Sequence, residues 1–172
     1  GYHLLAERPF EVVFVDFMKM PLSRCGKYRW VLVIVDQLTR LAVFGQCTNY
    51  TAAEAARVFI ERWLAFFPDP TFLVSDGGTH FTAGLFEEIA DIRGYCHRIT
   101  APHSPWTHGG VERLNRVLLK NLRSLLQARG LDERDWVPMI PVTQACVNKV
   151  LAVSSRGGKT PMELLTGLEP KS

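Results

Sequence analysis

The chain has 172 residues, of which 47% are hydrophobic and 22% are charged, and its formal net charge at pH 7 is +3. This size and composition are typical of one globular domain with a sizeable core, and no apolar run approaches the ~20 residues of a membrane-spanning helix. The four cysteines, Cys25, Cys47, Cys96 and Cys146, are scattered, which argues against a zinc motif or a disulfide framework.

The charge is unevenly distributed along the chain. Residues 1–100 carry 10 Lys and Arg against 11 Asp and Glu, whereas residues 101–172 carry 10 against 6. The basic excess therefore lies in the second part of the chain. It permits an anionic partner such as a nucleic acid without proving one.

The first part of the chain predicts three strands. The apolar run Val12–Met18 is typical of a buried strand, and residues 27–36 and 40–47 are two further β-rich runs. Because only the three residues QLT separate the last two runs, we expect an antiparallel hairpin.

A helix is predicted next. Thr51 followed by Glu54 predicts a capping box at its start, and Pro68 and Pro70 mark its end. Three further elements are predicted after it, a strand, a helix and a short strand, over residues 71–76, 81–94 and 95–101.

The last third of the chain predicts three helices. The longest runs from Gly110 to about Arg129 after a Pro- and Gly-rich loop, and it carries an apolar stripe at helical spacing that comprises Val111, Leu114, Leu118, Leu122 and Leu125. Asp132 is the N-cap candidate of the next helix, which Pro138 and Pro141 would kink or delay. Thr160 and Glu163 predict a capping box for a short final helix. The element order predicts an α/β fold with a mixed five-stranded sheet flanked by helices.

Three carboxylates occupy notable positions in these elements. Asp16 lies inside the most apolar strand, Asp76 lies where the fourth strand ends and the chain turns, and Glu112 opens the long helix. A buried carboxylate needs a partner, and ligands of α/β sheets gather at strand ends. Carboxylates suit Mg²⁺, and two such ions promote phosphoryl transfer.

Basic residues follow Glu112 on one face of the long helix. Arg116, Lys120 and Arg123 are spaced four and three residues apart, so they share the face of Glu112 opposite the apolar stripe and could contact DNA phosphates. They could equally be an ordinary solvated face.

Each acid also has a structural interpretation. Asp16 could be satisfied within its strand, Asp76 could form a turn before Gly77, and Glu112 could favour the helix N-terminus through the macrodipole. Asp36, at the predicted hairpin, could form a turn or be a fourth acid of the site.

Three stretches, "VDFMKMP", "LVSDGGTHF" and "PHSPWTHGGVERLNR", resemble the catalytic core of retroviral and LTR-retrotransposon integrases, in particular the Ty3/gypsy type. Asp76 and Glu112 are separated by 35 residues, as in that family's Asp, Asp, Glu signature. "TPMELLTGLEP" resembles the segment that follows the core in the same elements. The resemblance spans about Phe10 to Pro170.

The resemblance implies a ribonuclease-H-like fold and a site with two Mg²⁺ or Mn²⁺ ions held by Asp16, Asp76 and Glu112, with Asp16 bridging them. It implies DNA 3′-end processing followed by strand transfer, in a nuclear protein. It also implies that residues 1–172 are a single catalytic core domain, without the zinc-binding and small β-domains that usually flank it.

Several finer expectations accompany the resemblance. The segment 100–110 would be the mobile active-site loop, in which Trp106 could stack on a base or pack on its own protein. His108 and Asn115 are further candidate DNA contacts, although Asn115 could instead brace the loop. A homodimer is expected, for which the candidate surfaces are the helix with Trp136 and the helix with Trp63, Phe66 and Phe67. A chromatin or host tethering factor is a further possible partner.

Two other functions remain open at this stage. Host genomes take over integrase cores as DNA- or protein-binding modules that lack catalysis, and a metal nuclease of the same fold could act on RNA or hybrids. An intact trio of acids argues against the first, and the lack of a clear fourth acid argues against the second.

Overall fold

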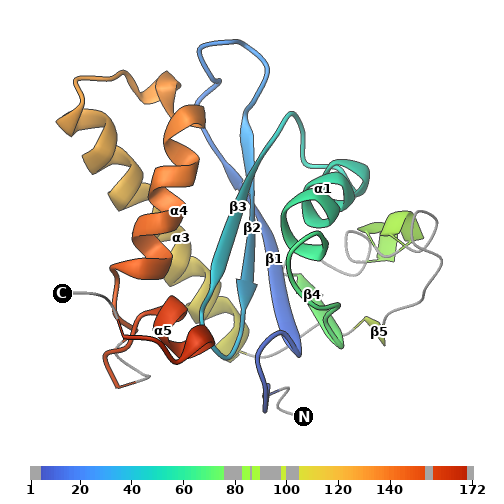
Figure 1. The fold of residues 1–172 in the computed structure, drawn as a ribbon. Helices are drawn as coiled ribbons and strands as arrows, with labels where there is room; N and C mark the ends of the chain where they lie inside the picture. The colour runs from blue at the N-terminus through green and yellow to red at the C-terminus, as the bar shows by residue number, and fades with distance from the viewer. Residues whose placement is uncertain are drawn as a thin grey trace.

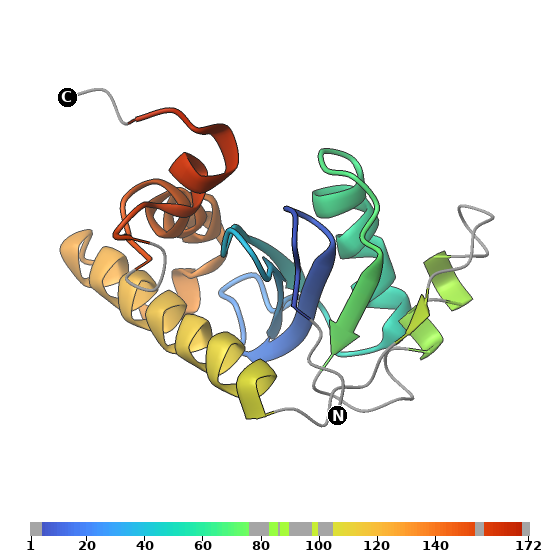
Figure 2. The same ribbon diagram turned by 90° about the horizontal axis from the view of Figure 1, so that it is seen from below.

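The computed structural model describes residues 5–75, 83–85, 87–89, 98–99, 105–153 and 157–169, with only the backbone of 98–99 and 105–111. In these residues a five-stranded sheet lies between two layers of helices (Figures 1 and 2). The strands are β1 Val12–Lys19, β2 Trp30–Asp36, β3 Ala42–Cys47, β4 Phe72–Ser75 and β5 Arg98–Ile99. The helices are α1 Ala52–Phe59, α3 Pro105–Ala128, α4 Ile140–Lys149 and α5 Pro161–Thr166, with a π-helical turn at Ile60–Leu64 and 3₁₀ turns at Glu133–Asp135 and Val137–Met139.

The sheet is mixed, with strand order β3-β2-β1-β4-β5. β1, β2 and β3 are antiparallel neighbours, whereas β1, β4 and β5 run parallel. This arrangement confirms the predicted hairpin and the predicted mixed sheet. None of the helices in the described ranges is both long and apolar enough to span a membrane.

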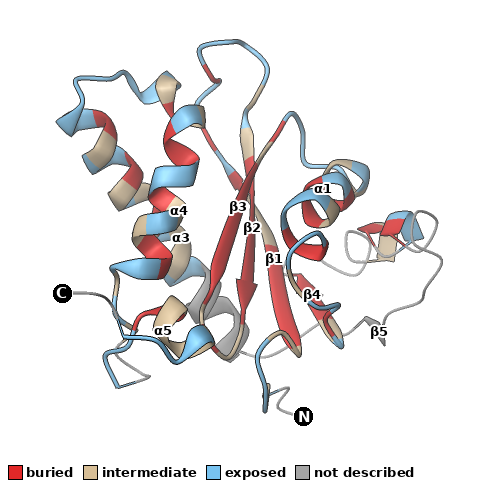
Figure 3. Ribbon diagram, viewed as in Figure 1, coloured by how far each residue is buried: buried red, intermediate tan, exposed pale blue. Residues whose placement is uncertain are grey.

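Two separate cores cover the two faces of the sheet, because successive residues of a strand point to opposite sides. On β1, Val13 and Val15 pack toward α1, whereas Val12, Phe14 and Met18 pack toward α3 and α4. Figure 3 shows the buried strands between helices that expose their outer faces. The central strands are therefore rigidly held, and any polar side chain on them has a fixed direction.

Two tryptophans expected on a dimer surface lie in these cores instead. Trp63 is 0% exposed in the α1-side core, and Trp136 is 0% exposed in the other, where its Nε1 donates to the carbonyl of Pro21 at 2.8 Å. Phe66, in the turn after the π-helical turn, is exposed, and Phe67 is half-buried. The expectation that these two tryptophans give their helices aromatic surface was wrong, because burial of such large apolar rings is strongly favourable. The two helices themselves stay candidate dimer surfaces.

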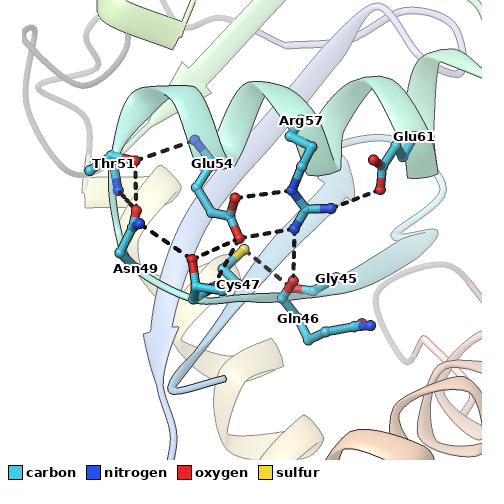
Figure 4. Close-up of polar contacts among 9 residues, drawn as sticks. Gly45, Gln46, Cys47, Asn49, Thr51, Glu54, Arg57 and Glu61 are labelled. Carbon is cyan, nitrogen blue, oxygen red and sulfur yellow. Dashed lines mark hydrogen bonds and ion pairs between the residues drawn. The ribbon is translucent and has the colours of Figure 1, made fainter. Parts of the chain in front are cut away.

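The predicted capping box at the start of α1 forms only in part. The Thr51 hydroxyl accepts from the backbone N–H of Glu54 at 3.3 Å, but the N–H of Thr51 donates to Asn49 rather than to Glu54. The Glu54 carboxylate instead accepts from the N–H of Thr48 at 2.9 Å. It also pairs with Arg57, as Figure 4 shows. A charged partner one turn along the helix thus replaces the second half of the box.

The long helix α3 begins at Pro105, five residues before the predicted start. Proline is favoured at the first helical position, and Gly109 and Gly110 lower helix propensity without preventing a helix. As a result, Glu112 is the eighth residue of α3 and not a first-turn charge. Residues 105–110 of the expected loop are helical, and 100–104 lie outside the described residues.

Asp132 and Thr160 both act as N-caps, as predicted. Asp132 caps a 3₁₀ turn rather than a long helix, and α4 begins only at Ile140, as the prolines at 138 and 141 predicted. At α5, Thr160 and Glu163 form both hydrogen bonds of the capping box, at 3.2 and 2.7 Å.

Strand β3 is at the edge of the sheet, and side chains of α4 cover part of that edge. The Asn148 amide accepts from the N–H of Ala42 at 2.9 Å and donates to the carbonyl of Ala42 at 2.6 Å. Gln144 accepts from the N–H of Phe44 at 2.8 Å. These amides therefore satisfy backbone groups that a neighbouring strand would otherwise use.

Candidate active site

Asp16 lies in the middle of β1, opposite Val33 of β2. It shares the alternation of Phe14 and Met18, so its side chain is on the sheet face that α3 covers. Asp16 is half-buried, whereas the residues before it on β1 are fully buried. The sequence thus places one carboxylate at the border between the core and the solvent.

Asn115 connects α3 to this carboxylate. Its Nδ2 donates to Oδ2 of Asp16 at 3.2 Å, across 99 residues of sequence. The amide is neutral, so this hydrogen bond orients the carboxylate and leaves its negative charge in place. From the sequence, Asn115 was expected either to brace the loop or to contact DNA. Its position three residues after Glu112 was the signal that could have placed it in the site.

The other atom of the Asn115 amide is also informative. Its Oδ1 is buried and has no hydrogen-bond partner in the part of the chain that the structure describes. A buried acceptor without a donor costs free energy of about 1–3 kcal/mol, and such atoms are rare in folded proteins. The site therefore carries an acceptor that a bound donor, such as water, could satisfy.

Glu112 lies on α3 one turn before Asn115 and is exposed. At 3.6 residues per turn, the two side chains project roughly 60° apart around the helix axis, so they lie on one side of α3. Since Asn115 contacts Asp16, Glu112 lies one helical turn from the contact between α3 and β1. The structure thus brings two of the three predicted acids to one region.

The third predicted acid, Asp76, lies outside the described residues. The last described residue before it is Ser75, the final residue of β4. Ser75 is buried and pairs in parallel with Val15, the neighbour of Asp16. The sequence continues directly from Ser75 to Asp76.

Asp36 has the structural role that was one of its two interpretations. It is 0% exposed, and its carboxylate accepts from the N–H of Phe10 at 2.8 Å and from the N–H and hydroxyl of Thr39 at 2.8 and 2.7 Å. Asp36 is two residues from Ile34 on β2, so both side chains are on the face of the α1-side core. Asp16 is on the opposite face of the sheet. This arrangement does not support Asp36 as a fourth acid of the site.

The predicted basic face of α3 is exposed to solvent. Arg116, Lys120 and Arg123 are all exposed, and none is in an ion pair within the described residues. Their charges are therefore available to an anion. Trp106 and His108 lie in α3, where the structure describes their backbone only.

A hollow of about 360 Å³ lies elsewhere, between α1 and the β3 edge. Arg57, which pairs with both Glu54 and Glu61, lines it together with these two acids, Lys27 and Arg62. It shares no residue with the region of Asp16 and Glu112. Asp16 and Glu112 are therefore not part of this hollow.

The donor chemistry of the region fits a hard divalent cation. Carboxylate oxygens are the ligands that Mg²⁺ prefers, and Asp16 and Glu112 supply them from two elements that the Asn115 hydrogen bond holds together. Oδ1 of Asn115, which has no donor within the described ranges, is an acceptor that a water of such an ion could use.

Comparison with solved structures defines the class of the fold. The chain is similar to the catalytic core domain of bovine immunodeficiency virus (BIV) integrase, with a TM-score of 0.66 and 21% identity over 90% of this chain and 93% of that one. It is similar to the HTLV-2 integrase catalytic core in complex with magnesium, with a TM-score of 0.69 and 18% identity over 92% and 98%. The fold is therefore the ribonuclease-H-like fold of integrase cores.

The sequence comparisons lead to the family. The chain is 29% identical over 166 residues to the Tf2-3 and Tf2-4 transposon polyproteins of Schizosaccharomyces pombe, which covers 96% of this chain. It spans 12% of the length of these relatives. The family described as the integrase core domain matches residues 6–105, and the chain belongs to this family.

Proposed function

We propose that this chain is the catalytic part of a DNA integrase that processes DNA 3′ ends and joins them to target DNA. Membership of the integrase core domain family and the similarity to Tf2 polyproteins support this activity. The structural observation that carries it is the hydrogen bond from Asn115 to Asp16, because it holds the helix of Glu112 against the strand of Asp16.

Both reactions are single displacements at phosphorus without a covalent intermediate on the protein. In end processing, a water oxygen attacks the phosphorus and the 3′ oxygen of the DNA end leaves as a hydroxyl. In joining, that 3′ hydroxyl attacks a phosphorus of the target, and a target 3′ oxygen leaves. The number of phosphodiester bonds is conserved in the joining step, so no external energy source is needed.

We assign Asp16, Asp76 and Glu112 as the carboxylates that would hold two Mg²⁺ ions, with Mn²⁺ as a substitute. When bound, such ions lower the pKa of the attacking O–H group and stabilise the leaving oxygen. Asn115 would keep the Asp16 carboxylate in one orientation. Arg116, Lys120 and Arg123 would hold DNA phosphates, and Trp106 and His108 would contact the DNA near the reacting end.

The proposed partners are DNA, a second copy of the chain and a host tethering factor in the nucleus. The HTLV-2 integrase core, with a TM-score of 0.66, is described in a dimeric form, which supports self-association. The chain is also similar to a simian T-cell lymphotropic virus intasome, with a TM-score of 0.75 and 18% identity over all of this chain and 61% of that one. That intasome is described in complex with PP2A regulatory subunit B56 gamma. It supports a host protein as a partner class.

The test is a disintegration assay, in which the chain resolves a branched DNA in the presence of Mg²⁺ or Mn²⁺. We expect Asp16→Asn and Glu112→Gln to lower the rate by more than about 100-fold, because loss of a ligand exceeds the 10–100-fold cost of losing an outer-shell partner. Glu133→Gln is the matched control, since Glu133 is exposed and lies far along the chain in a 3₁₀ turn.

The same variants separate the enzyme from a binding module without catalysis. Calorimetric titration with Mn²⁺ should show binding that Asp16→Asn abolishes and Glu133→Gln preserves. DNA binding with neither metal binding nor cleavage would contradict the enzyme and favour the module.

A further inference from the structure

Three aromatic rings form a continuous row where β1 ends and β2 begins. The ring of Phe17 meets Trp30 edge-on, with centroids 6.3 Å apart and planes at 76°. Trp30 in turn lies against Tyr50, with centroids 4.8 Å apart and planes at 49°. We call Phe17, Trp30 and Tyr50 the aromatic row.

Strand register explains how these distant residues meet. Trp30 pairs with Lys19 at the end of β1 and with Cys47 at the end of β3, so the three strands finish together at one end of the sheet. Tyr50 follows β3 by three residues, in the turn that leads into α1. The row is therefore fixed to the sheet through Phe17 and Trp30, and Tyr50 is its outer member.

The row becomes more exposed from Phe17 to Tyr50. Phe17 and Trp30 are half-buried and pack against the α1-side core, whereas Tyr50 is 65% exposed. Within the described residues, the Tyr50 hydroxyl makes no hydrogen bond. The fold thus keeps a large ring in water on a rigid base, although neither core packing nor a hydrogen bond holds it there.

The segment of the chain that carries Phe17 and Trp30 is basic. Nζ of Lys19 lies 5.9 Å from the ring centroid of Trp30. Residues 17–30 contain four cations and no Asp or Glu, and the cations are Lys19, Arg24, Lys27 and Arg29. Of these, Arg24 is paired with Asp135. The ligand that suits this surface is therefore an anion that also offers flat apolar faces.

We propose that the aromatic row binds unpaired bases of single-stranded DNA, with a base stacked on Tyr50 and phosphates near Lys19. Bases within a duplex already stack on one another, so a surface ring gains stacking only from a base that has left the duplex. Aromatic rings next to lysines are the usual platform of single-strand binding proteins, and each stacked base adds affinity without sequence preference.

This site is additional to the proposed catalytic region. Lys19 is three residues beyond Asp16, about 10 Å along β1, and points to the other face of the sheet. The proposal shares with the proposed function only the premise that DNA is the ligand.

The experiment measures fluorescence anisotropy of a labelled short oligodeoxythymidylate with the whole chain, without divalent metal. We expect Tyr50→Ala to weaken binding by about fivefold or more, because one stacking ring is lost. Tyr50→Phe keeps the ring and should bind like the unmodified chain. Phe66→Ala is the matched control and should change nothing, because Phe66 is 74% exposed and lies in the turn beyond the π-helical turn that follows α1.

An abasic oligonucleotide of the same length separates stacking from charge attraction. The unmodified chain should bind it more weakly than oligodeoxythymidylate, and Tyr50→Ala should have no further effect on it. Lys19→Gln should weaken the binding of both ligands and reduce its salt dependence.

The proposal is overturned if Tyr50→Ala binds oligodeoxythymidylate like the unmodified chain, or if it weakens the abasic ligand equally. Circular dichroism confirms that each variant is folded. Asp16→Asn should bind the oligonucleotide normally, so a failure of catalysis leaves this proposal intact, and a failure here leaves the catalytic one intact.

Discussion

Nδ2 of Asn115 on α3 donates a hydrogen bond to Oδ2 of Asp16 on β1 at 3.2 Å, while Oδ1 of the same amide is buried and has no partner among the residues that the structure describes. A buried orphan acceptor is unfavourable for folding alone. We infer that Asn115 serves the site at a cost to stability, as polar side chains behind metal ligands do in other proteins.

Replacement of Asn115 tests this inference. We expect Asn115→Ala to lower the metal-dependent disintegration rate by about 10–100-fold, since the Asp16 carboxylate loses the group that orients it. Urea unfolding should show a loss of no more than about 1 kcal/mol, because the unpaired Oδ1 disappears together with the hydrogen bond. Asn121→Ala is the control, since its amide donates to the carbonyl of Val117 in the same helix. An unchanged rate in Asn115→Ala would refute the positioning role.

Asp36 should govern stability and not metal binding. Its buried carboxylate accepts three hydrogen bonds, so Asp36→Ala leaves several buried donors unpaired and should cost about 3 kcal/mol or more in unfolding free energy. Asp36→Asn keeps one acceptor oxygen and should cost less. Mn²⁺ titration of Asp36→Asn should resemble that of the unmodified chain, and a loss of binding there would restore Asp36 as a candidate ligand.

The contact between β3 and α1 depends on the absence of a side chain at Gly45. A Cβ at this position would collide with Cγ1 of Val58. We expect Gly45→Ala to lower the unfolding free energy by about 1–3 kcal/mol, as overpacking does, and to lower the Tm by about 2–4 °C per kcal/mol.

A double variant isolates the cause. Val58→Ala removes the colliding methyl group, so Gly45→Ala combined with Val58→Ala should be more stable than the sum of the single losses predicts. Strict additivity of the two losses would mean that the collision is not their origin.

The Glu54–Arg57 pair should leave a signature at low pH. The hydrogen bond from Arg57 lowers the pKa of the Glu54 carboxyl below its ordinary value, against an opposing effect of burial. A depressed folded-state pKa gives stability that is present above the unfolded pKa of about 4.3 and is lost as the pH falls through the folded value.

The comparison variant is Glu54→Gln. Above about pH 5 the unmodified chain should be the more stable of the two by a constant amount, and the difference should shrink below about pH 4. High salt should reduce the difference, because the Arg57 side chain is 41% exposed. A difference in unfolding free energy that does not change with pH would exclude an ionic contribution from the pair.

Local patterns in the sequence were sufficient to predict most of the fold. The apolar run at Val12–Met18 became β1, and the short QLT connection became the turn between β2 and β3. Thr160 and Glu163 formed their capping box. These predictions hold because strand alternation, tight turns and helix caps are decided by residues close together in the chain.

The missed features depend on contacts between distant residues. Trp63 and Trp136 were expected on a surface, but no local pattern shows which apolar face of a helix meets the sheet. The start of α3 was misplaced because Gly109 and Gly110 suggested a loop, although Pro105 already begins a helix. The hydrogen bond from Asn115 to Asp16 and the aromatic row depend on strand register and helix docking, which single-sequence patterns do not contain.

The amides of Asn148 and Gln144 along β3 have a consequence for the behaviour of the protein at high concentration. They occupy the N–H groups of Ala42 and Phe44 to which an incoming chain would hydrogen-bond. Over this stretch, copies of the protein have no template for stacking strand upon strand into fibrils. Replacing these two amides by alanine would leave the N–H groups of Ala42 and Phe44 free to pair with a second chain. Slow amyloid-like precipitation would then become the main hazard of storing the purified protein.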